Sequence, residues 1–444
     1  MNQTQRSFGL PSQLALAIGL AFASCGASAQ TASETELARK LDQLTRELAD
    51  VKAQLSTLQQ QRAPAPATGN APTSAAAAPA TPANAPAIAV AAPAEPATVL
   101  TSYGEINYTR PTRSGQDQNT QADVSRFVLG YQHRFDERTK VVTELEVEHT
   151  VSSADDPGEV EVEQAYVERQ LTPTWSARGG LFLIPMGLLN ENHEPTAYYG
   201  VQRNFVETAI IPTTWREGGA QFIGNFDNGL TLQAGVSTGF NISKWDAAST
   251  EGSESPLGAI HQEMALANAR DLSVFGTLNW RGVPGLLVGG GVFTGGVSQK
   301  QAVTNSRVTL ADLHARWTPG RWDLSALYAW GMLSNTAALN TPLVGNPTLI
   351  PRSFDGGYLQ AAYQLWRQDE YLLAPFARIE QFNTARTYAD LGAGLTPAAA
   401  QTERVVTVGA NFQINPSVVL KADYQRFHVN RDADRFDLGL GWSF

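Results

Sequence analysis

Apolar and polar residues alternate over most of this chain. From Thr98 to the carboxyl terminus, segments of about ten alternating residues are separated by short turns and longer polar connections. Between Phe436 and Phe444, every even position is Phe, Leu or Trp and every odd position is Asp, Gly or Ser. Because successive side chains of a strand point to opposite faces, each such segment predicts a strand with one apolar face. Further examples lie at residues 126–134, 141–148, 230–236, 313–317, 322–330, 359–365 and 418–424.

The connections predict how these strands close. Short turns are expected at residues 136–138, 172–174, 227–229, 282–285, 319–321, 367–370 and 415–417. Longer connections are expected at residues 110–122, 151–158, 185–213, 241–269, 298–306, 334–352, 384–402 and 430–434. Seven short and eight mostly long connections in strict alternation join sixteen strands. Short periplasmic turns, long outer loops and aromatic girdles are typical of outer-membrane barrels. The sequence therefore predicts an all-β fold over residues 98–444, a sixteen-stranded antiparallel transmembrane β-barrel with both ends in the periplasm and a water-filled lumen.

The segment before the barrel divides into three parts. Residues 1–29 read as a signal peptide, with Arg6, an apolar run at 14–23 and a small-residue cleavage site at 27–29. A lipoprotein signal that uses Cys25 is the alternative. Residues 30–62 contain leucine and valine at heptad spacing, which predicts a periplasmic coiled coil, with one amphipathic helix as the alternative. Residues 63–97 hold eight prolines and seventeen alanines, which predicts an extended linker.

Composition removes several classes of function. The only cysteine is Cys25, inside the expected signal, so thiol catalysis, disulfides and cysteine metal sites are excluded from the mature chain. The formal net charge of −10 argues against nucleic-acid binding. The spacing of Glu191, His193 and Glu194 matches no helical metal motif, and no Ser-His-Asp set stands out, so we expect no metal, no cofactor and no enzymatic activity.

Several segments resemble the phosphate-selective porin O/P family. They are residues 180–187, 190–195, 211–219, 357–363 and 375–380, and the chain ends in the aromatic residue Phe444. The resemblance implies a homotrimeric diffusion channel in the bacterial outer membrane whose third loop folds into the lumen. It also implies that the barrel-assembly machinery recognises Phe444. The leucine heptads are similar to those of trimeric dicarboxylate-type porins, which favours a trimer.

The expected function is passive diffusion of small hydrophilic solutes, with a preference for small anions or carboxylates. Residues 98–444 contain only four lysines, so phosphate itself stays open. Two other hypotheses are an outer-membrane hydrolase barrel and a structural tether whose coiled coil binds the cell wall.

Charged residues of the polar strand faces and of the third loop are the candidate pore-lining set. The inward arginines are Arg126, Arg134, Arg178, Arg216, Arg316 and Arg378. The third-loop candidates are Glu191, His193, Glu194 and Arg203, with Glu207 and Glu217 expected to pin the loop to the wall. An arginine fork suits carboxylates and phosphates, although each arginine could instead pair with a wall carboxylate. An acidic patch is expected near the outer mouth, from Glu144, Glu146, Glu148, Glu159, Glu161 and Glu163.

Overall fold

The alternating segments of the chain form one sheet that closes on itself. The computed structural model describes residue 46 and residues 97–113, 115–116, 119–153 and 156–444. The chain separates into two units, Met1–Val90 and Ala91–Phe444, of which the second contains the barrel. The expected signal peptide, coiled coil and linker lie outside the described residues, apart from positions 46 and 97, and therefore stay predictions.

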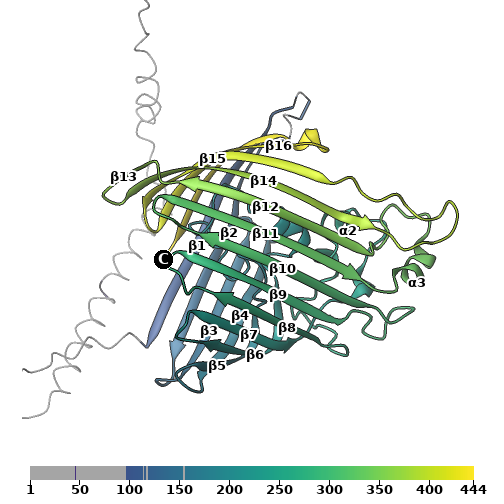
Figure 1. Ribbon diagram of the computed structural model, residues 1–444, viewed down its shortest axis with the longest axis horizontal. Helices are drawn as coiled ribbons and strands as arrows, with labels where there is room; N and C mark the ends of the chain where they lie inside the picture. Colours follow the sequence, from purple (N-terminus) through teal and green to yellow (C-terminus); the bar gives the residue numbers. More distant parts are fainter. Residues whose placement is uncertain (1–45, 47–96, 114, 117–118, 154–155) are drawn as a thin grey trace, which may run out of the picture. The chain divides into compact units, whose positions relative to one another are not determined.

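Antiparallel pairing runs around the whole sheet. The first strand, β1 (Thr98–Pro111), pairs with both β2 (Gln121–Arg134) and β17 (Arg435–Ser443), which closes the barrel. The short strand β13 (Trp366–Gln368) pairs only with β14 (Tyr371–Thr387), while β14 itself pairs with β12. Of the seventeen strands in the sheet, sixteen therefore form the closed wall, seen from one side in Figure 1. The predicted sixteen-stranded antiparallel barrel is confirmed.

The other strands follow one another along the chain. They are β3 (Thr139–Glu148), β4 (Glu159–Gln170), β5 (Trp175–Leu183), β6 (Arg216–Asn225), β7 (Leu230–Ser237), β8 (Ser273–Trp280), β9 (Leu286–Gly296), β10 (Arg307–Trp317), β11 (Trp322–Leu333), β12 (Ser353–Tyr363), β15 (Glu403–Asn415) and β16 (Val418–Phe427). Every predicted turn and long connection lies between two of these strands, with ends shifted by a few residues. The exception is the predicted turn at 367–370, where β13 extends the hairpin beyond the wall.

The turn at residues 226–229 shows how local sequence sets the strand register. Asn228-Gly229 is a strong hairpin signal because such turns need positive φ angles. Gly229 has φ of +82°, and a Cβ there would lie 2.7 Å from the Arg281 carbonyl carbon. The Phe226 amide donates to the Leu230 carbonyl at 2.9 Å, which closes the hairpin between β6 and β7.

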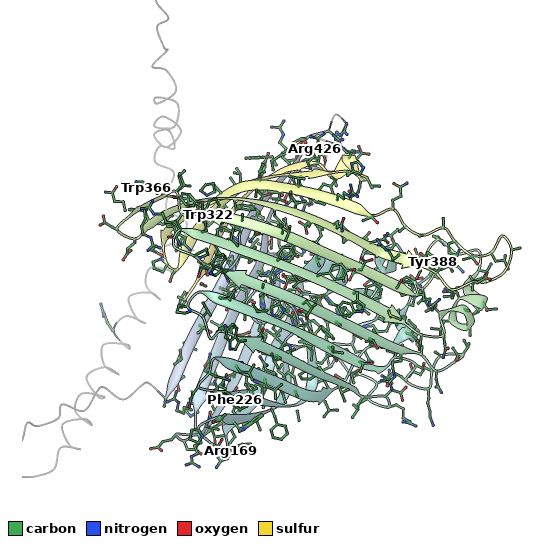
Figure 2. All side chains as sticks on the ribbon, in the orientation of Figure 1. Arg169, Phe226, Trp322, Trp366, Tyr388 and Arg426 are labelled. Carbon is green, nitrogen blue, oxygen red and sulfur yellow. The ribbon has the colours of Figure 1, made fainter. Side chains whose placement is uncertain are left out.

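The outward face of the wall is apolar. Leu313, Leu359 and Ile379 are 64%, 68% and 63% exposed. Their neighbours along each strand point inward and are buried or half-buried, as the alternation predicts. Figure 2 shows Trp322, Trp366 and Phe226 near the end of the barrel that carries the short turns, and Tyr388 near the other end. Trp322, Trp366 and Phe226 are exposed, as expected for an aromatic girdle at the short-turn end.

Where the structure describes the long connections, their helices are only short turns. They are η2 (Val206–Ile210), η3 (Ile242–Lys244), α2 (Glu251–Glu254), η4 (Gly258–Ile260), α3 (Thr336–Asn340), η5 (Thr341–Leu343) and η6 (Arg431–Ala433). In Figure 1, α2 and α3 lie at the end of the barrel opposite the carboxyl terminus. Among the described residues, we find no helix with the length and apolarity needed to cross a membrane.

Part of the lumen differs from the water-filled interior expected from the sequence. Residues 184–215 (loop 3) and 238–272 (loop 4) carry apolar side chains that pack against the inner wall. The Trp215 ring lies 5.2 Å from Phe240 of loop 4 and 4.5 Å from Phe293 of β9, between ring centroids, and all three are fully buried. The Trp245 Nε1 donates to the Thr348 carbonyl, which ties loop 4 to the long connection between β11 and β12. These loops therefore narrow the lumen with a packed apolar cluster.

Candidate pore constriction

Loop 3 begins after β5, crosses the interior of the barrel and is anchored to the wall between β1 and β14, and β14 lies opposite β5 in the closed sheet. On the β1 side, the Tyr198 hydroxyl donates to Glu105 at 2.7 Å. Four strands further along the wall, the Phe205 amide donates to Glu380 of β14 at 2.6 Å. Between them, the Val201 amide donates to Asp423 of β16 at 2.6 Å. Buried carboxylates of three wall strands thus hold the loop by its backbone and side chains, and the third loop folds into the lumen as the resemblance implies.

Glu207 fixes the turn within loop 3. Its carboxylate accepts hydrogen bonds from the amides of Leu188 and Leu189, from the Asn204 side chain and from the Tyr358 hydroxyl of β12. Its side chain is fully buried, and burial raises the pKa of Glu207 while these four donors act to lower it. The expectation that Glu207 pins the loop agrees with this geometry.

Glu217 has a similar arrangement at the start of β6. It accepts from the Trp215 indole at 3.2 Å and from the Thr238 hydroxyl at 2.5 Å. These donors come from the end of loop 3 and the start of loop 4, so one buried carboxylate joins both loops to the wall.

A second anchor lies at His193. Its Nε2 is 2.7 Å from the Tyr103 hydroxyl and 2.8 Å from Glu163 of β4, and its Nδ1 is 2.9 Å from the Asn190 carbonyl. Glu163 is the extra residue of a bulge in β4, because Glu144 pairs with Gln164 and Leu145 pairs with Val162. The bulge aims the carboxylate at the loop, so His193 braces loop 3 and contacts no cavity.

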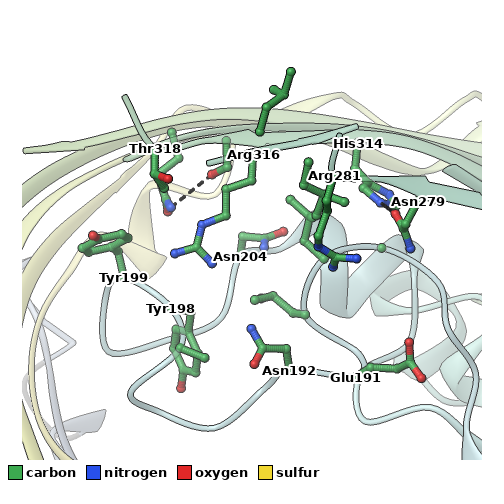
Figure 3. Close-up of a pocket in the computed structure, with 18 of the residues that line it drawn as sticks. Glu191, Asn192, Tyr198, Tyr199, Asn204, Asn279, Arg281, His314, Arg316 and Thr318 are labelled. Carbon is green, nitrogen blue, oxygen red and sulfur yellow. Dashed lines mark hydrogen bonds between the residues drawn. The ribbon is translucent and has the colours of Figure 1, made fainter. Parts of the chain in front are cut away.

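The inner cavity lies between loop 3 and the wall of β8, β10–β12 and β14. It has a volume of about 620 Å³ and reaches the short turns after β8 and β10. Figure 3 shows Arg281, Arg316 and His314 on one side of the cavity, with His314 beside Asn279, and Glu191 and Asn192 of loop 3 on the other side. Arg281 follows β8, whereas His314 and Arg316 both lie on β10, and the loop residues form the opposite side of the space.

Cations outnumber anions around the inner cavity. Arg281, Arg316 and Arg378 line it together with one carboxylate, Glu191. Arg378 is buried against Glu380 at 3.0 Å, and Arg316 forms a bidentate pair with Asp323. Arg281 is exposed and makes no ion pair with any described residue. The side chains that line the inner cavity therefore carry a net positive charge, and Arg281 is the lining arginine that no carboxylate of the described residues holds in an ion pair.

The outer cavity lies on the other side of loop 3. It measures about 320 Å³ and is lined by loop 3 residues 208 and 212–214, by loop 4, and by β2–β4 and β6. Its charged residues are Glu146, Glu148, Glu159, Glu161, Glu263, Arg126 and Arg216. Four of the predicted acidic-patch residues line this cavity. The carboxylates exceed the arginines here, so the two cavities on either side of loop 3 have opposite charge.

The predicted arginines lie in three kinds of environment. Arg316 and Arg378 line the inner cavity and Arg126 and Arg216 the outer one. Arg134 lies exposed at the end of β2, near the short-turn rim. Arg126 bridges Glu105 at 2.9 Å and Glu146 at 3.3 Å, and Arg216 pairs with Glu161 and Glu263. Most of these arginines therefore also brace the wall.

Arg178 and Arg203 are held away from both cavities. Arg178 pairs with Glu168 at 3.0 Å and stacks 4.3 Å over the Tyr166 ring. Arg203 is 7% exposed, and one of its nitrogens donates to the Thr214 hydroxyl at 3.2 Å.

The loop carboxylates also differ in position. Glu191 lines the inner cavity, accepts from Gln233 at 2.9 Å and lies 3.9 Å from Arg178. Glu194 is half-buried and lines neither of the two cavities. Within the described ranges, no cluster of three or more His, Cys, Asp or Glu side chains is arranged to hold a metal ion.

Two residues of this region escaped the sequence analysis. Arg281 follows β8, and continuing the alternation of β8 by one residue past Trp280 would have placed it inward beside Asn279. Lys421 is buried on β16 with its ammonium 3.5 Å above the Tyr198 ring, where it supports loop 3. The contact between Lys421 and Tyr198 could not be predicted, because it depends on how loop 3 folds against β16.

Known proteins share this barrel fold. No protein-family model matches the chain. Over 356 residues it is 28% identical to an uncharacterized protein of Aquifex aeolicus (strain VF5), which covers 78% of this chain and 79% of that protein. The structure of Salmonella typhi OmpF in complex with daunomycin aligns with a TM-score of 0.53 and 13% identity, over 78% of this chain and 97% of that one. The similarity to OmpF shows a common fold, and membership of the phosphate-selective porin O/P family stays a prediction.

Proposed function

We propose that this protein is an outer-membrane porin through which small hydrophilic solutes diffuse passively. The observation that carries the proposal is loop 3, which crosses a closed sixteen-stranded barrel between two cavities. An apolar outer face and a charged interior suit a barrel that sits in lipid and contains water. Loop 3 then acts as the size filter of the channel.

A preference for small anions, carboxylates in particular, is part of the proposal. Three arginines and one glutamate line the inner cavity, and the free guanidinium of Arg281 can bind a carboxylate through two parallel hydrogen bonds. Inside a low-dielectric wall, a few fixed charges raise the local concentration of counter-ions. The acidic outer cavity acts in the opposite direction, so we place anion selection at the inner cavity.

The assembly follows from the same proposal. We propose export through the signal peptide, insertion by the barrel-assembly machinery through Phe444, and a homotrimer in the outer membrane with the coiled coil in the periplasm. An apolar outer wall of this extent can be covered by lipid and by neighbouring subunits.

Conductance across planar lipid bilayers tests the proposal. We expect purified full-length protein to produce stepwise, ohmic currents, and a tenfold KCl gradient to give a reversal potential of the sign set by chloride. A chain inactivated by heat is the control for leakage. If the protein inserts as a folded barrel and produces no current steps, the channel proposal is contradicted. If it conducts but the reversal potential has the sign set by potassium, only the anion preference is contradicted.

A further inference from the structure

Three arginines lie on the outward face of the barrel, at the end that carries the long connections. They are Arg110 of β1, Arg404 of β15 and Arg426 of β16, here called the arginine rim. All three are exposed, and none forms an ion pair or side-chain hydrogen bond with the described residues. Figure 2 shows Arg426 at the periphery of the barrel. These arginines are therefore free to bind a group outside the protein.

The pairing of the strands brings the rim together. Arg426 lies opposite Val406, so Arg404 is its diagonal neighbour on the same face of the sheet. Diagonal neighbours on one face are about 7–8 Å apart, within reach of long side chains. Arg110 lies opposite Phe436, which itself lies opposite Tyr424 of β16. Arg110 and Arg426 thus flank an aromatic pair, Tyr424 and Phe436, and Arg404 lies beside Arg426.

No carboxylate on this face neutralises the rim. The outward positions of β15, β16, β17 and β1 are otherwise apolar, small or hydroxyl-bearing in the described chain. Two neighbouring acids have other roles, and a third, Asp432, lies exposed in the turn between β16 and β17. Glu403 accepts from the amides of residues 428, 429 and 430, and Asp434 is buried and accepts from the Phe427 amide. In a protein with a net charge of −10, this face therefore carries only positive charge.

Apolar side chains continue from the rim toward the middle of the wall. Val406 and Val408 of β15, Leu420 of β16 and Leu438 of the neighbouring β17 are 42%, 48%, 41% and 43% exposed and lie between the arginines and the middle of the wall. A surface with cations at one edge and an apolar face beside them fits an amphiphile with a phosphate headgroup and acyl chains. Arginine donates two parallel hydrogen bonds to phosphate, and acyl chains pack on exposed aliphatic side chains.

We propose that the arginine rim binds a phosphorylated lipid of the outer leaflet. Its phosphate contacts Arg404 and Arg426, and its acyl chains lie along β15–β17. The inference rests on the proposed function in one respect, the placement of the barrel in the outer membrane with its long connections outside. The lipid site itself requires no solute to pass through the channel.

Native mass spectrometry of the full-length protein in detergent tests the proposal. The probe is lipid A with two phosphates, compared with the same lipid after enzymatic removal of both phosphates. We expect wild-type protein to bind the bisphosphorylated lipid about tenfold more tightly than Arg404→Gln/Arg426→Gln does, because two charge-assisted contacts are lost. The dephosphorylated lipid should bind both proteins equally and weakly.

The matched control is Arg138→Gln/Arg321→Gln, which removes two exposed arginines from the short-turn end. It should bind the lipid as wild type does, and Arg404→Lys/Arg426→Lys should recover part of the affinity. Migration of the unheated barrel on SDS gels reports folding of every variant. Equal lipid binding by wild type and the glutamine variant would overturn the proposal. So would a change of oligomeric state with lipid binding unchanged, which would assign the rim to a subunit contact. Neither result depends on conductance, so the porin proposal is tested separately.

Discussion

At the scale of single residues, the arginines of the inner cavity differ in their partners. Arg316 and Arg378 form ion pairs with carboxylates of the wall, and Arg281 forms none with the described residues. Arg378 is 2% exposed and hydrogen-bonded to Glu380, to Gln360 and to the Tyr199 carbonyl. Removing Arg378 would leave the Glu380 charge buried and unpaired, which is strongly destabilising. Arg281 forms no ion pair with the described residues and acts only at longer range on Glu191 of loop 3, so we expect that it can be replaced without damage to the wall.

Arg281→Gln is therefore the cleanest test of charge selection. We expect the anion-to-cation permeability ratio to fall about two- to threefold in 0.1 M salt, because one unit charge about 5–6 Å from a solute in water contributes less than 1 kcal/mol. The effect should shrink as the salt approaches 1 M, where the Debye length is about 3 Å. Reversal potentials measure the ratio, with Arg138→Gln as a control far from the cavity. An unchanged ratio would show that selection lies elsewhere.

At the scale of elements, loop 3 depends on a few buried carboxylates rather than on regular secondary structure. Its one helical turn, η2, has only five residues. The hydrogen bonds of Glu207, Glu380 and Asp423 replace the backbone pairing that a strand would have. The position of the loop thus depends on wall residues distant in sequence.

Glu207→Ala should release the turn of loop 3. Four buried donors lose their acceptor, and each unsatisfied buried group costs about 1–3 kcal/mol. We expect a larger and noisier single-channel conductance and faster cleavage of loop 3 by added protease, while the barrel still migrates as a folded species. The exposed Glu137→Ala in the β2–β3 turn is the control. Conductance and cleavage equal to wild type would contradict the pinning role.

The last strand is the second element with a specific prediction. Phe444 is 71% exposed, and its backbone pairs with Ser102 in both directions at 2.9 and 3.0 Å. We expect Phe444→Ala to lower the amount of folded barrel in the outer membrane and to leave the conductance of each channel unchanged, because the side chain faces away from the lumen. Quantitative blotting of membrane fractions measures the first effect. Wild-type amounts of folded Phe444→Ala protein would count against an assembly role.

The strands of the barrel wall and the direction of their side chains could be predicted from the sequence. The packing of loops 3 and 4 inside the lumen could not. Alternation such as that of Phe436 to Phe444 places each side chain because a strand has a period of two. The apolar residues of loop 4, Phe240, Trp245 and Ile260 among them, follow no period, and their burial depends on a tertiary fold over Trp215. The bulge at Glu163 is equally hidden, since it depends on register with β3. The inward position of Arg281 could have been predicted from the alternation of β8, whereas the burial of Arg203 in loop 3 could not.

At the scale of the whole molecule, opposite charges lie on the two sides of one constriction. The outer cavity carries five carboxylates and two arginines, and the inner cavity three arginines and one carboxylate. An entering solute would meet these fields in sequence, separated by loop 3. The function proposed for the protein therefore depends on whether solutes pass along loop 3 through the inner cavity.

A single introduced thiol tests that path most directly. The only cysteine, Cys25, lies in the expected signal peptide, so Asn192→Cys gives a unique reactive site in mature protein. Asn192 is exposed on loop 3 and lines the inner cavity. We predict that a membrane-impermeant sulfonated methanethiosulfonate lowers the single-channel current of Asn192→Cys, that dithiothreitol restores it, and that Asn228→Cys in a short turn is unaffected. A current that is unchanged after verified labelling of Asn192→Cys would contradict the account, because ions would then bypass loop 3.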